Sequence, residues 1–141
     1  MSKKVEQVKK KLRKIHEKIY LYEELKKKAQ AELEEQYDLL KQYETEENLK
    51  KYKKYIKLGY FFRYGYSDSM YFITELMPNT FKCVDLDYDC NKQYTVPYER
   101  IVNAIAHYVE CKKAEVSIGA TGPILFGVIL YDANKKEINL S

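Results

Sequence analysis

The first 58 residues contain neither glycine nor proline, and Gly59 is the first residue of either kind. Lysine, glutamate, leucine, glutamine and alanine dominate this stretch, and all five have high helix propensity. Glycine and proline are the residues that most often end a helix, so their absence predicts one long α-helix over residues 1–58.

Apolar residues recur within this stretch at the heptad spacing of a coiled coil. With Val5 at position a, ten of the twelve a and d sites up to residue 43 are apolar or aromatic, Lys26 and Gln36 being the exceptions. Such a pattern predicts a helix that pairs with another helix, most simply that of a second copy. The larger apolar residues of this heptad seam are Val5, Val8, Leu12, Ile15, Ile19, Tyr22, Leu33, Leu40 and Tyr43.

The charge of the predicted helix is distributed in blocks. Residues 1–28 carry a net charge of +7, residues 29–49 carry −6 and residues 50–58 carry +5. A parallel pair in register places each block beside its own copy, which is unfavourable. An antiparallel pair centred near residue 28 places the first basic block opposite the acidic block. A fold-back of the helix within one chain, at Lys26 or Gln36, pairs the same blocks and remains an alternative.

From residue 59 the chain consists of short β-type runs separated by turn residues. We expect strands at 58–64, 70–76, 81–86, 93–96, 108–112, 115–118, 124–131 and 138–140, with one short helix near 97–107. The predicted fold class is therefore α+β: a long N-terminal coiled-coil helix, then a small antiparallel β domain at 59–141. The strands up to residue 97 resemble SH3-like barrels in layout.

Aromatic residues are concentrated at the start of this β domain, in the run 60–66. Alternate residues of a strand point to opposite faces, so one aromatic face enters the core and the other is free for a partner, unless both are buried. The residues predicted to bind a partner are Tyr60, Phe62, Arg63, Tyr64, Tyr66, Tyr71 and Tyr88.

Three motifs have the residue types of a chemical site without its full pattern. Asp85, Asp87 and Asp89 alternate as in a calcium loop, but the required glycine and distal glutamate are missing. Cys83, Cys90 and Cys111, with His107, match no compact zinc spacing. The G-x-x-G at 119–122 lacks the lysine of a phosphate loop. We predict no catalytic residue, no cofactor and no metal site.

Because no nucleophile–base pair, metal triad or cofactor loop is apparent in the sequence, a binding protein is favoured over an enzyme. No apolar run approaches the roughly 20 residues that span a bilayer, and the sparse cysteines suit the cytoplasm. The leading interpretation is a non-enzymatic, coiled-coil assembly protein whose β domain binds another protein, such as a phage or mobile-element accessory that inhibits a host factor. The alternative is a non-specific nucleic-acid binder that uses lysine clusters and exposed tyrosines.

The antiparallel arrangement is tested by spin labels at Lys14→Cys and Gln42→Cys, with the three native cysteines replaced by alanine. In a mixture of the two singly labelled proteins we expect a short distance between the labels of different chains. An offset of 28 residues at helical rise gives about 40 Å in a parallel pair, and that distance contradicts the arrangement.

Overall fold

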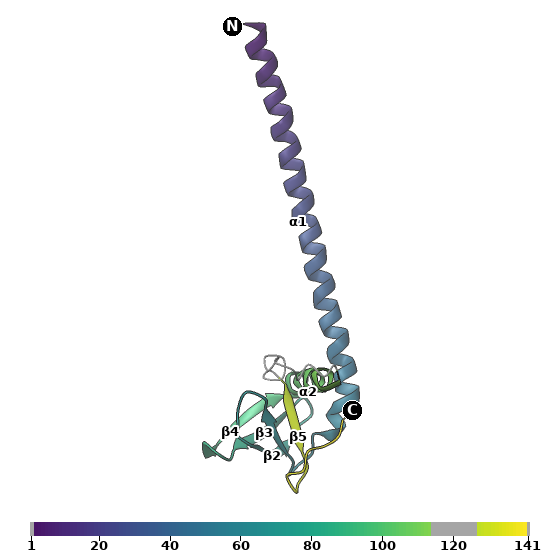
Figure 1. The fold of residues 1–141 in the computed structure, drawn as a ribbon, viewed down its shortest axis with the longest axis vertical. Helices are drawn as coiled ribbons and strands as arrows, with labels where there is room; N and C mark the ends of the chain where they lie inside the picture. Colours follow the sequence, from purple (N-terminus) through teal and green to yellow (C-terminus); the bar gives the residue numbers. More distant parts are fainter. Residues whose placement is uncertain (1, 114–126, 141) are drawn as a thin grey trace. The chain divides into compact units, whose positions relative to one another are not determined.

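The computed structural model describes residues 2–113 and 127–140, and the chain forms two compact units, Met1–Gln42 and Tyr43–Ser141. The predicted α+β class is confirmed: a long helix precedes a five-stranded antiparallel sheet and a second helix (Figure 1). The elements are α1 (Lys3–Tyr52), a 3₁₀ turn (Lys53–Tyr55), β1 (Phe61–Tyr64), β2 (Tyr71–Leu76), β3 (Thr80–Asp85), β4 (Asp89–Pro97), α2 (Tyr98–Lys113) and β5 (Val128–Tyr131).

Helix α1 is continuous over 50 residues, and none of its residues is buried. It ends at Tyr52, earlier than the predicted residue 58. After the 3₁₀ turn, Ile56 adopts an extended conformation and is buried in the core of the second unit, and Gly59 has a φ of +83°. Burial of Ile56 therefore ends the helix before the first glycine. In the described part of the chain, no helix has the length and apolar character needed to cross a membrane.

The sheet of the second unit has the strand order β4-β3-β2-β1-β5. The first four strands form a meander, and β5 returns to pair antiparallel with β1. Strand β1 therefore has a neighbour on each side, with Phe62 opposite Tyr71 of β2 and Leu130 of β5. Strands β4 and β5 do not pair within the described residues, so the SH3-like layout stays a prediction.

Helix α2 covers one face of this sheet with an apolar stripe at helical spacing (Figure 1). Ile101, Val102 and Ile105 are fully buried. Because the stripe continues to Val109, the helix runs to Lys113 instead of ending near residue 107. The predicted strand at 108–112 is wrong, since this apolar periodicity prevails over the β propensity of Tyr108 and Val109. The core also contains Ile56, Phe62, Ile73, Phe81, Cys83, Val96, Tyr98, Val128 and Leu130.

Other predicted strands differ from the structure at their ends. Strand β4 is longer than the predicted 93–96 because it pairs with β3 over most of its length. The segment 138–140 is not a strand, although the amide of Ile138 donates to the carbonyl of Leu130 at 3.0 Å. The predicted strand 115–118, the G-x-x-G at 119–122 and residues 124–126 lie outside the described residues.

The last turns of α1 belong to the second unit and pack on α2. The Asn103 side chain accepts a hydrogen bond from Asn48 and donates one to Thr45, both at 2.9 Å. Leu49 and Tyr52 lie against the core on the same side of the helix. Tyr43, Glu47 and Lys50 remain exposed. These last three are the a and d positions that continue the heptad, so the domain does not use the seam face here.

Gly127 lies so close to α2 that a side chain does not fit. A Cβ atom at this position meets Tyr108 Cβ at 2.7 Å and its Cα at 3.1 Å. We expect Gly127→Ala to lower the free energy of unfolding by about 1–3 kcal/mol through overpacking, measured by urea denaturation.

The matched control is Gly59→Ala. Its Cβ has nothing within 4 Å, but the residue has a φ of +83°. We expect the strained backbone alone to cost about 1 kcal/mol. A Gly127→Ala protein as stable as wild type contradicts the close packing of residue 127 on α2.

Candidate functional site

Two loops meet at one end of the sheet and carry most of the residues predicted to bind a partner. The β1–β2 loop and the β3–β4 turn are joined by two hydrogen bonds. The Leu86 amide donates to the Met70 carbonyl at 2.9 Å, and the Met70 amide donates to Asp87 Oδ2 at 2.7 Å. We call residues 64–71 and 85–91 the tyrosine tip.

Aromatic rings in the tyrosine tip contact one another. Tyr64 stacks on Tyr66 with ring centroids 5.4 Å apart and meets Tyr71 edge-on at 5.6 Å. Tyr71 also stacks on Phe62 at 5.0 Å and meets Tyr94 of β4 at 6.2 Å. The rings of Tyr64, Tyr66 and Tyr71 are thus continuous with the aromatic part of the core, which holds them in place.

The tyrosine tip also presents rings and hydroxyl groups to solvent. Tyr66 is 62% exposed and Tyr88 is 86% exposed, while Tyr64 and Tyr71 are half-buried. Within the described residues, none of these four hydroxyls has a hydrogen-bond partner, and no buried side-chain polar atom lacks one. The hydroxyls therefore reach water and can bind a partner. Tyrosine suits such surfaces because it combines apolar area with a polar end.

The structure brings together five of the seven residues predicted to bind a partner. Tyr64, Tyr66, Tyr71 and Tyr88 form the tip, and Arg63 borders it by donating to the Ser67 carbonyl at 3.1 Å. Phe62 and Tyr60 are the two that do not belong to the tip.

Phe62 is a correction, because its ring is fully buried between the sheet and α2 and is not available to a partner. Tyr60 lies before β1, at the end opposite Tyr64, and packs half-buried against the core. Tyr94 was not among the residues predicted to bind a partner. The sequence predicts its strand, 93–96, but does not show that its ring meets Tyr71.

The aspartates of the tip support its backbone. Asp85 is buried, and its Oδ1 accepts the amides of Asp87 and Tyr88 at 3.0 and 3.2 Å. Asp89 Oδ1 accepts the Asn91 amide at 3.0 Å. The alternating aspartates therefore fold the turn. None of Asp68, Asp85, Asp87 and Asp89 forms an ion pair with a described residue.

Burial changes the acidity of Tyr64 and Tyr71 in the tip and of the buried Cys83. Desolvation, with a smaller contribution from the Asp85 carboxylate, raises the pKa of Tyr71 to about 12. The same two causes raise the pKa of the Cys83 thiol to about 12. Burial also raises the pKa of Tyr64. These groups are neutral near pH 7, and Cys83 is neither a reactive thiolate nor a ready metal ligand there.

The heptad seam is a second candidate surface. Its nine side chains range from 45% exposed at Val5 to 72% exposed at Tyr22. Lys27 and Glu24 form an ion pair on α1 at 3.9 Å, with both side chains largely in water. The described residues thus leave the whole apolar stripe of α1 uncovered.

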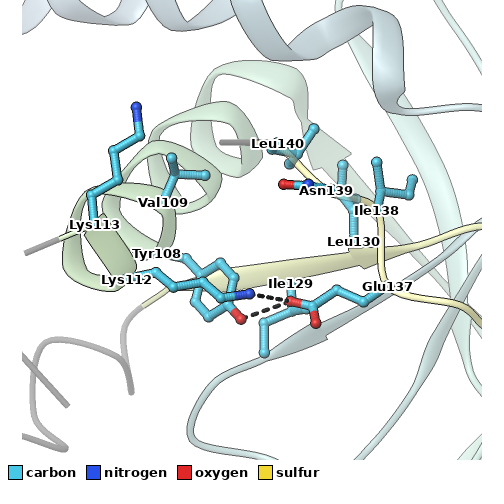
Figure 2. A pocket seen from close by; sticks show the side chains of 10 residues that line it. All are labelled: Tyr108, Val109, Lys112, Lys113, Ile129, Leu130, Glu137, Ile138, Asn139 and Leu140. Atoms are coloured by element: carbon cyan, nitrogen blue, oxygen red, sulfur yellow. Dashed lines mark hydrogen bonds and ion pairs between the residues drawn. The ribbon is translucent and has the colours of Figure 1, made fainter. Parts of the chain in front are cut away.

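A small cavity of about 270 Å³ lies between α2, β5 and the C-terminal segment (Figure 2). Val109, Leu130 and Ile138 contribute apolar walls. At its rim Glu137 Oε1 accepts a hydrogen bond from the Tyr108 hydroxyl at 2.7 Å and pairs with Lys112 at 3.5 Å (Figure 2). These contacts attach the C-terminal segment to α2. Among the described residues that line the cavity, no nucleophile is paired with a base.

The cysteines lie apart from one another. Cys83 is buried on β3, Cys90 is exposed, and the Cys111 sulfur lies 3.7 Å from His107 Nε2 one turn earlier in α2. Among the residues that the structure describes, no three side chains of His, Cys, Asp or Glu are grouped so that they could hold a metal ion.

Comparisons with known proteins found no matching family model, no similar curated protein and no similar solved structure.

Ionisation of the tip tyrosines predicts a specific alkaline instability. The folded-state pKa of Tyr71 is raised, so the unfolded chain loses this proton first as the pH rises above 10. The folded state is therefore progressively disfavoured between pH 10 and 12. We expect Tyr71→Phe to lose stability less steeply than wild type over this interval, in urea denaturation followed by circular dichroism.

The control replaces Tyr20, an exposed residue of α1, by phenylalanine. Equal slopes for wild type and Tyr71→Phe between pH 10 and 12 contradict the assignment.

Proposed function

We propose that this chain is a non-enzymatic assembly and protein-binding module. Its α1 helices associate through the heptad seam as an antiparallel coiled coil, and its second unit binds another protein through the tyrosine tip. The observation that carries the proposal is the exposure of every seam residue, from Val5 to Tyr43, on a helix without a single buried residue.

The exposed seam supports self-association because monomeric proteins rarely leave a long apolar stripe in water. The apolar residues of the stripe recur at alternating intervals of three and four residues, which is the spacing that knobs-into-holes packing requires. Charge supplies the direction, because the +7 and −6 blocks attract only when the helices run in opposite directions. Individual exposed ion pairs contribute little, about 0.2–1 kcal/mol each, so the apolar seam supplies stability and the charges supply orientation.

The tyrosine tip supports a binding role for the second unit. Tyr71 is held by ring contacts with Phe62 and Tyr94, and Tyr66 is held by stacking on Tyr64, so this part of the tip is preorganised and little entropy is lost in ordering it on binding. Exposed tyrosine is also enriched among the residues that dominate protein interfaces. The narrower role of a phage or mobile-element inhibitor of a host factor rests on composition, in which 22 lysines stand against 3 arginines.

Nucleic-acid binding is the second candidate, favoured by the lysine clusters 9–11 and 26–28. The tip argues against stacking bases there, because its aspartates repel phosphate groups. A nucleic-acid complex of this chain therefore uses the lysines of α1, and its affinity falls steeply with salt.

Self-association is tested by Leu12→Asp/Ile19→Asp. Two charges in the seam oppose the burial of this face, so we expect the double variant to be a monomer in light scattering at a concentration where wild type is a dimer. Helix content at lower concentration serves as a second measure, because an isolated helix is weakened when its partner is lost.

The control is Leu21→Asp, which adds the same charge at a residue 60% exposed and outside the seam. This control keeps the wild-type mass. Wild-type mass for the double variant, or a monomeric wild type, contradicts the seam as an interface.

A further inference from the structure

Lysine side chains lie over aromatic rings in much of the second unit, but not at the tyrosine tip. The six lysine–ring pairs, at 4.7–5.8 Å from the ring centroid, are Lys53–Tyr98, Lys54–Tyr55, Lys57–Tyr60, Lys92–Tyr94, Lys112–Tyr108 and Lys135–Phe61. Within the described residues, no such pair involves the tip tyrosines Tyr64, Tyr66, Tyr71 and Tyr88. Cations are attracted to the faces of tyrosine rings. Tyr64 covers one face of Tyr66, and Tyr71 is stacked on Phe62, so the faces left for a cation are the outer face of Tyr66 and the ring of Tyr88.

The tip also carries more negative than positive charge, although Arg63 and Lys92 flank its two segments and Arg100 acts electrostatically on Tyr64. Residues 64–71 and 85–91 contain four aspartates and no lysine or arginine. The nearest arginine in sequence, Arg63, is already engaged: its Nη1 donates to the Ser67 carbonyl at 3.1 Å and its Nε to the Tyr131 hydroxyl at 3.4 Å. Asp68, on the β1–β2 loop, is exposed and forms no hydrogen bond or ion pair with a described residue.

We propose that the tyrosine tip binds a polypeptide segment rich in arginine or lysine. The cationic side chains lie on the ring faces of Tyr66 and Tyr88, and the Asp68 carboxylate pairs with one of them. This inference rests on the tip being the docking surface of the proposed function, and it names the chemistry of the partner.

The features of the tip favour a cationic peptide over other partners. Rings alone suit apolar side chains or nucleic-acid bases, but the aspartates beside them repel phosphate and disfavour purely apolar groups. A guanidinium group meets both requirements, since it stacks on aromatic rings and donates to carboxylates. The free tyrosine hydroxyls can accept hydrogen bonds from the same side chains or from the peptide backbone.

The test is isothermal titration of the full chain with the capped peptide Gly-Arg-Gly-Arg-Gly-Arg, compared with the corresponding glutamate peptide. We expect the arginine peptide alone to bind. Tyr66→Ala/Tyr88→Ala should weaken its binding about tenfold, the effect of losing two exposed cation–ring contacts. Asp68→Asn should weaken binding and reduce its salt dependence.

The control variant is Tyr20→Ala/Tyr22→Ala, which removes two rings that are 62% and 72% exposed on α1. It should bind the arginine peptide as wild type does. Equal losses in the tip and control variants, or no loss in either, overturn the proposal and place cation binding on the acidic block 29–49.

Absence of arginine-peptide binding at millimolar concentration also overturns the proposal. Preferential binding of the glutamate peptide, lost in the tip variant, keeps the tip as a docking surface but overturns the cationic partner. Light scattering on the same samples reports self-association separately, so failure of the seam and failure of the tip are distinguishable.

Discussion

Packing of the apolar stripe of α2 on one face of the sheet is the interaction on which the rest of the second unit depends. Ile101, Ile105 and Val102 are fully buried there, opposite Phe62 and Phe81. Each large apolar side chain that is completely buried contributes roughly 1.5–3 kcal/mol. This packing requires a close approach between α2 and the chain at Gly127, and it determines which face of every strand points inward.

The position of the tyrosine tip follows from that choice of face. Phe62 points toward α2, and Tyr64, two residues later, points to the same side of β1. Tyr71 and Tyr94 contact this line of rings from the neighbouring strands. The rings are covered at Phe62 and half-buried at Tyr64 and Tyr71, and Tyr66 emerges into solvent in the loop. One aromatic series therefore serves both the core and the surface that we propose as a binding site.

Helix α1 follows a different principle. The apolar residues of its heptad seam, from Val5 to Tyr43, are all exposed and contribute nothing to a core within the described chain. Isolated helices are only marginally stable in water, so most of the stability of such a helix comes from packing. A second helix with complementary charge supplies that packing in the proposed assembly. In the second unit, hydrogen bonds of Asn103 with Thr45 and Asn48 attach the end of α1 to α2.

The sequence alone determined the features that depend on local composition and periodicity. The absence of glycine and proline before Gly59 predicts the long helix. Short β-type runs separated by turn residues predict the ends of β1, β2 and β3 to within a few residues. The tertiary structure decided the features that depend on distant contacts. Burial of Ile56 ends α1 at Tyr52. The apolar stripe of α2 continues to Val109, so the helix extends over residues 108–112, which were predicted to form a strand.

The candidate site likewise combines features that the local sequence specifies with features that packing decides. Alternation in 60–66 shows that Phe62 and Tyr64 share a face, but it does not show where α2 covers that face. Only packing decided that Phe62 is fully buried while Tyr66 is exposed, and that Tyr94 joins the rings from β4. The physical reason is that local sequence specifies the direction of a side chain relative to its strand, whereas burial depends on what distant residues place against it.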